Sequence, residues 1–67
     1  MTILVNDQPR EIASGLTVEE LVRDLGLAGR KGIAIAINDE VVPRASWTTR
    51  RLASGERVLV IRATQGG

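Results

Sequence analysis

The sequence ends in two glycines, Gly66 and Gly67, and the reactive group at such an end is its free α-carboxylate. Glycine has no side-chain bulk and adopts backbone angles that other residues avoid, so a diglycine can be threaded into a narrow cleft of another protein. Five extended residues, 63–67, span roughly 17 Å, which carries the carboxylate well clear of a folded domain. A carboxylate becomes reactive when it attacks an ATP phosphate to give an acyl adenylate, whose AMP a nucleophile then displaces. Gly67 is therefore the candidate site of covalent chemistry.

The same tail has a second interpretation. Chain ends are commonly disordered and rich in glycine without any function. Two terminal glycines alone do not separate the two cases, so the rest of the sequence has to decide between them.

The composition argues against an active site made by this chain alone. The 67 residues include no Cys and no His, so the chain lacks a thiolate nucleophile and also the commonest general base and metal ligand. No nucleophile, base and orienting group stand at a recognisable spacing. We therefore expect a protein that is not an enzyme and that binds no metal and no cofactor of its own.

Size and charge indicate one small soluble domain. A chain of 67 residues has marginal stability, and its core must be aliphatic because Trp47 is the only aromatic residue. Nine basic and eight acidic residues are interspersed and give a net charge of +1, which is not the pattern of a nucleic-acid-binding protein. There is no basic leader and no apolar run of membrane-spanning length. We expect a cytoplasmic protein that binds neither nucleic acid nor membrane.

The first half of the chain predicts a β-hairpin followed by a helix. Strand formers at 2–5 are followed by turn residues at 6–9 and by a second short run. Thr17 can cap a helix, with Glu20 three residues later to complete a capping box. The helix should end near Gly26. Its apolar stripe consists of Val18, Leu21, Val22 and Leu25.

The second half predicts three strands. Large and small residues alternate over 33–37, so the isoleucines should pack under the helix and the alanines should lie on the opposite, flatter face. A short or peripheral strand should follow at 40–42, because Pro43 cannot donate to a ladder. Residues 46–52 should be irregular or form a helical turn, and 57–62 is the most strand-like run of the sequence.

One helix covers only one face of such a sheet, and the last strand is apolar on both sides. If Val58 and Val60 point inward, the alternate residues of this strand lie on the open face. An exposed apolar patch on a small domain is a candidate partner surface. The alternative is that loops cover these residues or that the strand is central, since surface apolar residues are common. The predicted patch consists of Leu4, Ala36, Leu59 and Ile61.

The order of elements, the open face and a last strand that runs into Gly66-Gly67 together resemble the ubiquitin-like β-grasp fold. The resemblance implies an α+β domain over residues 1–62, with a mixed sheet of four to five strands and one main helix packed on one face. Residues 63–67 form a flexible C-terminal tail in this interpretation.

A narrower resemblance covers nearly the whole chain. The motifs that carry it are Ile3-Leu4-Val5-Asn6-Asp7, Thr17-Val18 with Leu21-Val22, Ala34-Ile35-Ala36-Ile37-Asn38, Val42-Pro43-Arg44 with Trp47, Leu52 with Gly55-Glu56 and Val58, and the terminal diglycine. With these motifs the sequence resembles the ThiS family, the sulfur carrier proteins of thiazole formation in thiamine biosynthesis. Where that family usually has Gly-Asp before the last strand, this chain has Gly55-Glu56, which keeps the charge.

The resemblance implies a sulfur carrier whose catalytic groups all belong to partners. An E1-like adenylating enzyme uses ATP to adenylate the Gly67 carboxylate, and sulfur from a desulfurase system replaces AMP. The resulting thiocarboxylate delivers its sulfur to thiazole synthase. Gly66 is then the spacer that enters the partner's active site, and Gln65 makes contacts along the tail. The absence of Cys fits this role, because the chain cannot hold sulfur on a side-chain thiol.

Two residues of the Val42-Pro43-Arg44 motif region receive less specific roles. Arg44 is assigned either to the partner-binding surface, facing an acidic partner, or to an exposed ion pair with Glu40 or Glu56, which would contribute only about 0 to 1 kcal/mol. Trp47 is expected to pack over the core, as a lone large aromatic residue in a small domain usually does.

Other functions remain open from the sequence. The small subunit of molybdopterin synthase has the same fold and thiocarboxylate chemistry but gives its sulfur to a pterin precursor; the short length and the motif of Pro43, Arg44 and Trp47 favour the thiamine carrier. A ubiquitin-like modifier would be conjugated through Gly67 to lysines of target proteins. A plain interaction module would keep its function without Gly66 and Gly67. An enzyme with its own active site ranks last.

Overall fold

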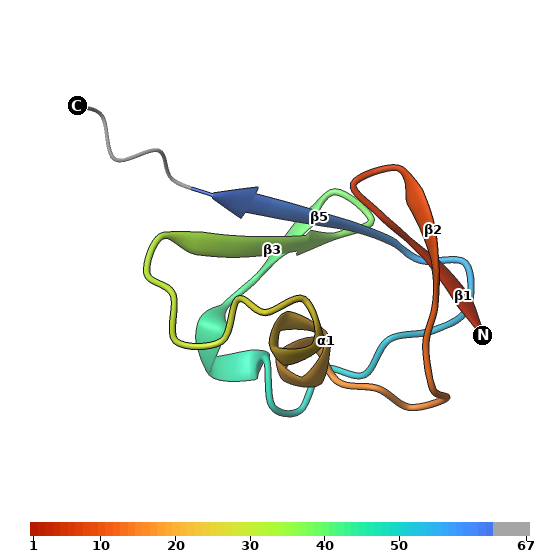
Figure 1. Ribbon diagram of the computed structural model, residues 1–67, viewed down its shortest axis with the longest axis horizontal. Coiled ribbons are helices and arrows are strands. Elements are labelled where there is room, and N and C mark those ends of the chain that lie inside the picture. The colour runs from red at the N-terminus through yellow and green to blue at the C-terminus, as the bar shows by residue number, and fades with distance from the viewer. Residues whose placement is uncertain (63–67) are drawn as a thin grey trace.

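The elements follow one another in the order that the sequence predicts. The computed structural model describes residues 1–62, and in it two strands precede a helix and three strands follow it (Figure 1). The elements are β1 (Thr2–Val5), β2 (Gln8–Glu11), α1 (Val18–Asp24), β3 (Ile33–Ile37), β4 (Glu40–Val42), the short 3-10 helix η1 (Arg44–Ser46) and β5 (Arg57–Arg62).

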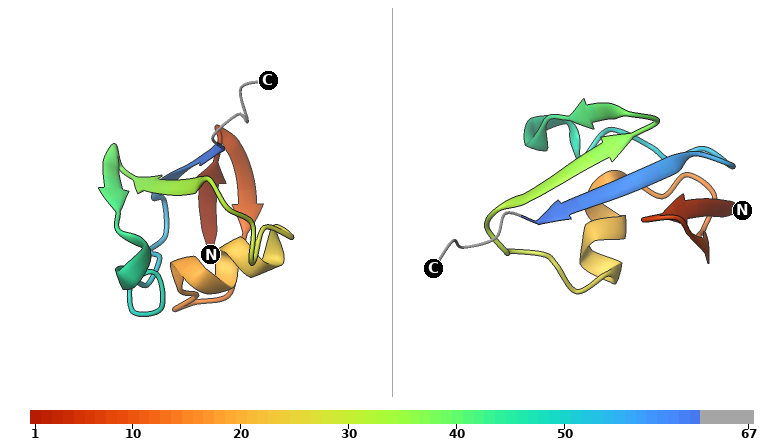
Figure 2. Two further views of the ribbon diagram at one scale, coloured as in Figure 1. Left: turned by 90° about the vertical axis from the view of Figure 1, so that its left-hand side faces the viewer. Right: turned by 90° about the horizontal axis from the view of Figure 1, so that it is seen from above.

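The five strands form one mixed sheet in the order β2-β1-β5-β3-β4. The last strand of the sequence, β5, therefore lies at the centre of the sheet, parallel to β1 and antiparallel to β3 (Figure 2). The hairpins β1–β2 and β3–β4 are antiparallel and put β2 and β4 at the edges. Pro43 directly follows the edge strand β4, which confirms the prediction of a short, peripheral strand at 40–42.

Both hairpins turn on an Asn-Asp pair. Asn6 and Asp7 have φ of 49° and 67°, and Asn38 and Asp39 have φ of 50° and 70°. Positive φ at both central residues is what a two-residue type I′ turn requires. The sequence-based expectation of a longer turn over 6–9 is wrong in its extent, because the left-handed pair closes the hairpin by itself and β2 already begins at Gln8.

The helix begins and ends where its capping residues predict. The Thr17 hydroxyl accepts a hydrogen bond from the Glu20 N–H (3.2 Å), and the Glu20 carboxylate accepts one from the Thr17 N–H (2.9 Å). These hydrogen bonds from the Thr17 main chain and side chain lower the pKa of Glu20. At the other end, Gly26 has φ of 75° just after the C-cap Leu25, which ends the helix at Asp24.

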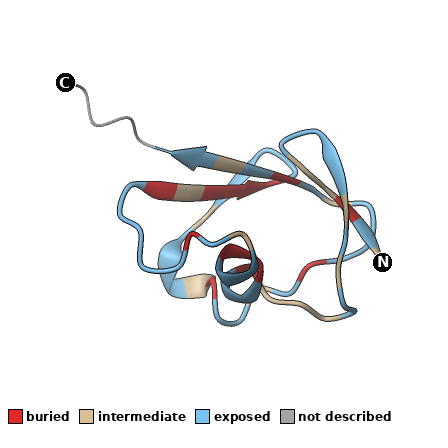
Figure 3. Ribbon diagram, in the orientation of Figure 1, coloured by how far each residue is buried: buried red, intermediate tan, exposed pale blue. Residues whose placement is uncertain are grey.

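The core lies between α1 and one face of the sheet. The three isoleucines of β3 are buried in the same cluster as the helix residues, as the alternation predicts, and Figure 3 shows β3 mostly in the red of buried residues. Trp47 is 6% exposed and donates its indole N–H to the Val42 carbonyl (3.0 Å), so its predicted structural role is confirmed. The buried cluster consists of Ile3, Val18, Leu21, Val22, Leu27, Ile33, Ile35, Ile37, Trp47, Leu52 and Val58.

The segment before β5 is held by Glu56. Its carboxylate accepts hydrogen bonds from Arg50 Nη2 (2.8 Å) and from the Ala53 N–H (2.6 Å), and its side chain is only 13% exposed. Burial raises the pKa of Glu56, but the hydrogen bonds and the charge of Arg50 lower it by more, so the pKa lies below its usual value. The Glu56 carbonyl also accepts from the Leu4 N–H (3.0 Å), which fixes the start of β5 against β1.

Glu56→Gln is expected to lower the free energy of unfolding by about 1 kcal/mol at neutral pH, because a charge-assisted hydrogen bond is lost beside a half-exposed arginine. A carboxylate with a lowered folded-state pKa stabilises the fold above the ordinary pKa of 4.5, and this contribution disappears as the pH falls through the folded-state value. Urea unfolding of both proteins at several pH values should therefore show their difference shrinking below pH 4.5. A difference that stays constant into acid would contradict this role of Glu56.

Candidate functional site

The predicted site of covalent chemistry lies outside the described residues. Gln65, Gly66 and Gly67 all follow Arg62, the last residue that the structure describes. Their roles as tail residues and as the modified residue therefore stay predictions, as does the domain boundary at residue 62. The structure does show that the central strand β5 ends five residues before Gly67.

An apolar patch covers the face of the sheet opposite α1. Val58 and Val60 point toward the helix, and the alternate residues Leu59 and Ile61 are 50% and 43% exposed on the other face. Since β5 is central, its outward side chains are open to solvent only because no element of residues 1–62 packs over this face (Figure 3). The structure thus brings together the residues that we call the open-face patch, namely Leu4, Ala36, Leu59 and Ile61.

Strand register fixes how the patch is built. Ala36 is the direct partner of Leu59, and Ala34 is the direct partner of Ile61. Because each alanine of β3 has a small side chain, the large β5 side chain beside it protrudes from this face, as the large-small alternation of β3 predicts. Ile61, the outermost large residue of the patch, lies one residue before the end of β5.

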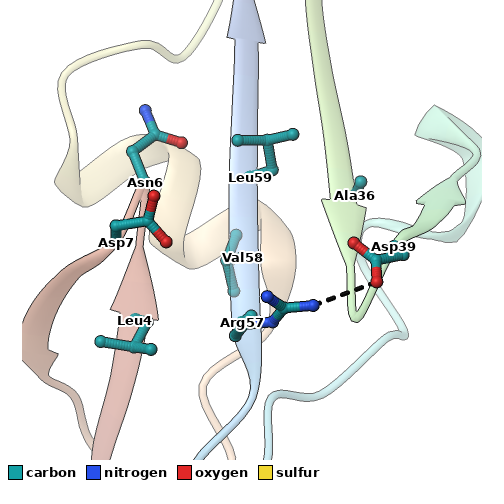
Figure 4. A pocket seen from close by; sticks show the side chains of 8 residues that line it. All are labelled: Leu4, Asn6, Asp7, Ala36, Asp39, Arg57, Val58 and Leu59. Carbon is teal, nitrogen blue, oxygen red and sulfur yellow. Dashed lines mark hydrogen bonds and ion pairs between the residues drawn. The ribbon is translucent and has the colours of Figure 1, made fainter.

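A shallow pocket of about 220 Å³ lies at the start of the patch (Figure 4). Leu4 from β1, Leu59 from β5 and Ala36 from β3 form its apolar part. The charged part comes from the two hairpin turns and from Arg57, whose guanidinium lies 3.0 Å from the Asp39 carboxylate. A partner group that fits here must combine an apolar contact with polar contacts at one end. The whole lining consists of Leu4, Asn6, Asp7, Ala36, Asp39, Arg57, Val58 and Leu59.

Sequence reasoning missed Val41 as a further residue of this face. Val41 is 66% exposed and is the direct partner of Ala36 across the β3–β4 ladder, so it extends the apolar surface toward the sheet edge. The signal was present in the pair Val41-Val42, because only one of two consecutive strand residues can point inward. Pro43 indicates where the strand ends, but it does not indicate which of the two valines faces outward.

Arg44 is not brought to the open-face patch. It lies beside α1, where its guanidinium donates to the Ile33 carbonyl (3.2 Å) and stands 4.5 Å from the centroid of the Trp47 ring. Arg44 does make its contacts within the domain, but the predicted ion pair with Glu40 or Glu56 is wrong, because its partners are a carbonyl and an aromatic ring and Glu56 pairs with Arg50. Spacing of charges along the sequence cannot reveal a cation–π contact, which depends on the orientation of a ring.

Within residues 1–62, no three Asp or Glu side chains gather closely enough to hold a metal ion. The helices of the described chain are also too short and too polar to cross a membrane.

Comparison with known proteins decides the family. A family model described as the ThiS family matches residues 3–67. The chain belongs to the ThiS family. The sulfur carrier protein ThiS of Escherichia coli (strain K12) is 39% identical to it over 67 residues, which is 100% of both chains.

Solved structures of the ThiS family have the same fold. The crystal structure of a thiamine biosynthesis protein (ThiS) from Geobacter metallireducens is 28% identical and covers 100% of both chains with a TM-score of 0.85. A solution NMR structure of a thiamine biosynthesis protein from the same organism matches 100% of this chain and 88% of its own, with 28% identity and a TM-score of 0.81. The predicted ubiquitin-like β-grasp fold is confirmed.

A second curated relative is much longer. A thiazole synthase of Paramagnetospirillum magneticum (strain ATCC 700264 / AMB-1) is 30% identical over 67 residues. The match covers 100% of this chain but 20% of that protein, so a segment similar to the ThiS family chain occupies about a fifth of the synthase.

The exposure of the patch leads to a prediction about stability. Leu59→Thr and Ile61→Thr should each change the free energy of unfolding by no more than about 0.5 kcal/mol, because the side chains are exposed and threonine is a good strand former. Val58→Ala, at the adjacent but buried position, should cost about 2 kcal/mol. Urea unfolding measures all three, and a loss for Leu59→Thr as large as for Val58→Ala would show that the patch belongs to the core.

Proposed function

We propose that this chain is a sulfur carrier of thiamine biosynthesis. The observation that carries the proposal is the full-length similarity to a protein named as a sulfur carrier, over a match that includes the terminal diglycine. The described domain is consistent with it, because a β-grasp domain without Cys or His lacks a thiolate nucleophile and the commonest general base.

In the proposed cycle the chain acts through the Gly67 carboxylate. The carboxylate oxygen attacks the α-phosphate of ATP in the active site of an adenylating enzyme, and pyrophosphate leaves. A hydrosulfide ion then attacks the acyl carbon, the bond between that carbon and the AMP oxygen breaks, AMP leaves, and loss of the S–H proton gives the thiocarboxylate. Its sulfur is a better nucleophile than the carboxylate oxygen it replaces. Gly66 leaves the approach to the acyl carbon unhindered because it has no side chain.

Partners supply all the catalytic groups, so the chain must be recognised by them. We assign this recognition to the open-face patch, which presents Leu59 and Ile61 on the strand that leads to the tail. Apolar side chains that stand free on a small domain are typical of binding sites. Ile61 precedes Gly67 by only six residues, so an enzyme that covers the patch also has the Gly67 end within reach.

Thiazole synthase is the proposed acceptor of the sulfur. The segment similar to this chain within a thiazole synthase supports the assignment, because one polypeptide that contains both parts keeps them at high effective concentration. A separate carrier must obtain the same proximity through its binding surface.

Adding one alanine after Gly67 is expected to abolish loading and to leave the fold unchanged, because the added residue displaces the carboxylate from the adenylating centre but lies far from the core. The measurement is the intact mass of the protein after incubation with ATP, a sulfur donor and the adenylating enzyme, with fragmentation to locate any change. The unextended protein should gain the mass difference between sulfur and oxygen at Gly67.

Two results would contradict the proposed function. One is loading of the extended protein at the rate of the unextended one. The other is an unchanged mass of the unextended protein with an adenylating enzyme that loads its own carrier under the same conditions. Thermal unfolding of both proteins provides the control that the extension has not damaged the domain.

Leu59→Thr and Ile61→Thr are each expected to raise the KM of the adenylating enzyme for the carrier roughly tenfold, since a central apolar anchor of an interface typically contributes about 1 to 2 kcal/mol. The readout is the rate of pyrophosphate release at varied carrier concentration. Arg44→Ala is the control, because Arg44 lies beside α1 and away from the patch. Unchanged KM for both threonine variants, with a raised KM for Arg44→Ala, would move the partner surface to the helix side.

A further inference from the structure

The two Asn-Asp turns flank the central strand β5, and each gives its asparagine side chain to that strand. The Asn6 Oδ1 accepts a hydrogen bond from the Val60 N–H (2.8 Å). The Asn38 Oδ1 accepts one from the Arg57 N–H (3.0 Å). Asn6 thus holds the end of β5 nearer to Gly67, whereas Asn38 holds its beginning.

The Asn6 side chain continues the ladder between β1 and β5 after β1 has ended. Along this parallel pair, the Leu4 N–H donates to the Glu56 carbonyl (3.0 Å) and the Asn6 N–H donates to the Val58 carbonyl (2.9 Å). The next bond of a regular parallel ladder would join the Val60 N–H to the main-chain carbonyl of residue 6. The chain turns away there with φ of 49°, and the Asn6 carboxamide oxygen takes the place of that carbonyl.

The second end of the carboxamide contacts the same residue. The Asn6 Nδ2 lies 3.5 Å from the Val60 carbonyl oxygen, so one side chain faces both polar groups of the Val60 main chain. Figure 4 shows Asn6 where β1 ends, beside β5. An asparagine at this turn position is therefore suited to two tasks at once, since it tolerates positive φ and imitates one residue of a strand.

The end of β5 that is nearer to Gly67 has few other contacts. Strand pairing with β1 stops at Val58. On the helix side, a cleft of about 320 Å³ opens between the end of α1 and the last residues of β5, and its lining includes Leu25, Leu27, Val60 and Arg62. The packing that holds Val58 in the core is thus reduced at Val60, which is only half-buried. Hydrogen bonds to β3 and to Asn6 must fix the strand here.

Val60 stands between the two large residues of the open-face patch. A shift of its main chain moves Leu59 and Ile61 together, and it also changes the direction in which β5 leaves the domain. The same hydrogen bond therefore acts on the patch and on the last residues of β5 together.

The geometry points to Asn6 as a positioning residue for loading of the carrier, through its hydrogen bond to the Val60 main chain. This inference rests on the proposed function. Asn6 takes no part in the chemistry, but it holds the end of β5 in the orientation that a partner bound to the open-face patch requires. Without this hydrogen bond, the end of β5 samples more orientations in the unbound carrier. Binding must then restrict them, and this entropic cost lowers the apparent affinity for the partner.

The chain contains its own matched control. Asn38 has the same φ to within a degree, sits in the same kind of turn and bonds to the same strand at the opposite end. Asn6→Gly and Asn38→Gly each delete the carboxamide and keep a residue that adopts positive φ without strain. Asn6→Asp restores an acceptor oxygen at the position of Oδ1.

The test combines amide exchange with kinetics of the full chain. By NMR, Asn6→Gly should speed exchange of the Val60 amide at least fivefold and leave the Arg57 amide unchanged, and Asn38→Gly should do the reverse. With the adenylating enzyme and ATP, Asn6→Gly should raise KM for the carrier about fivefold, equivalent to about 1 kcal/mol, with kcat within twofold. Asn38→Gly and Asn6→Asp should keep the wild-type KM.

The outcomes separate this inference from the proposed function. Equal KM values for wild-type and Asn6→Gly, or an equal rise for Asn6→Gly and Asn38→Gly, would overturn the positioning role while loading of the wild-type protein upholds the carrier function. Equal acceleration of both amides in Asn6→Gly would show a global loss of stability and would also overturn it. A wild-type protein that is never adenylated would overturn the proposed function, and the role of Asn6 in loading with it.

Discussion

The packing of one seven-residue helix against one face of the sheet is the interaction on which this structure depends. Val18, Leu21 and Val22 of α1 meet the three isoleucines of β3 and the inward valines of β5. Within residues 1–62 no helix covers the opposite face, so that face must be stable in water or against a partner. The apolar residues that β5 turns outward, Leu59 and Ile61, lie outside the buried cluster, and the proposed function assigns them to recognition.

Local features of the fold could be predicted because they depend on neighbours in the sequence. The capping box of Thr17 and Glu20 and the alternation of β3 each fix an element or a face by short-range contacts. The alternation alone also places Leu59 and Ile61 outward. The sequence did not reveal that β5 is central and parallel to β1, because the pairing of distant strands is decided by how the whole sheet closes over α1.

The residues that sequence reasoning misplaced or missed act through geometry that spacing does not encode. Arg44 was considered only as a charge, yet its guanidinium stacks on Trp47 and donates to a carbonyl. Val41 was read as a strand residue near a proline, yet its register partner Ala36 sets it on the open face. Asn6 was read as a turn former, and its second role as a substitute for a strand residue is visible only when β5 lies beside it.

The position of β5 ties the two parts of the proposed function together. Val58 fixes this strand in the core, Leu59 and Ile61 display the patch, and Asn6 extends the hydrogen-bonded ladder to Val60 after β1 has turned away. A strand at an edge of the sheet would be held on one side only, and its end would move with every opening of that edge. Because β5 is hydrogen-bonded on both sides, Leu59 and Ile61 keep the register of the core, and the surface that we assign to partner recognition is held in one arrangement.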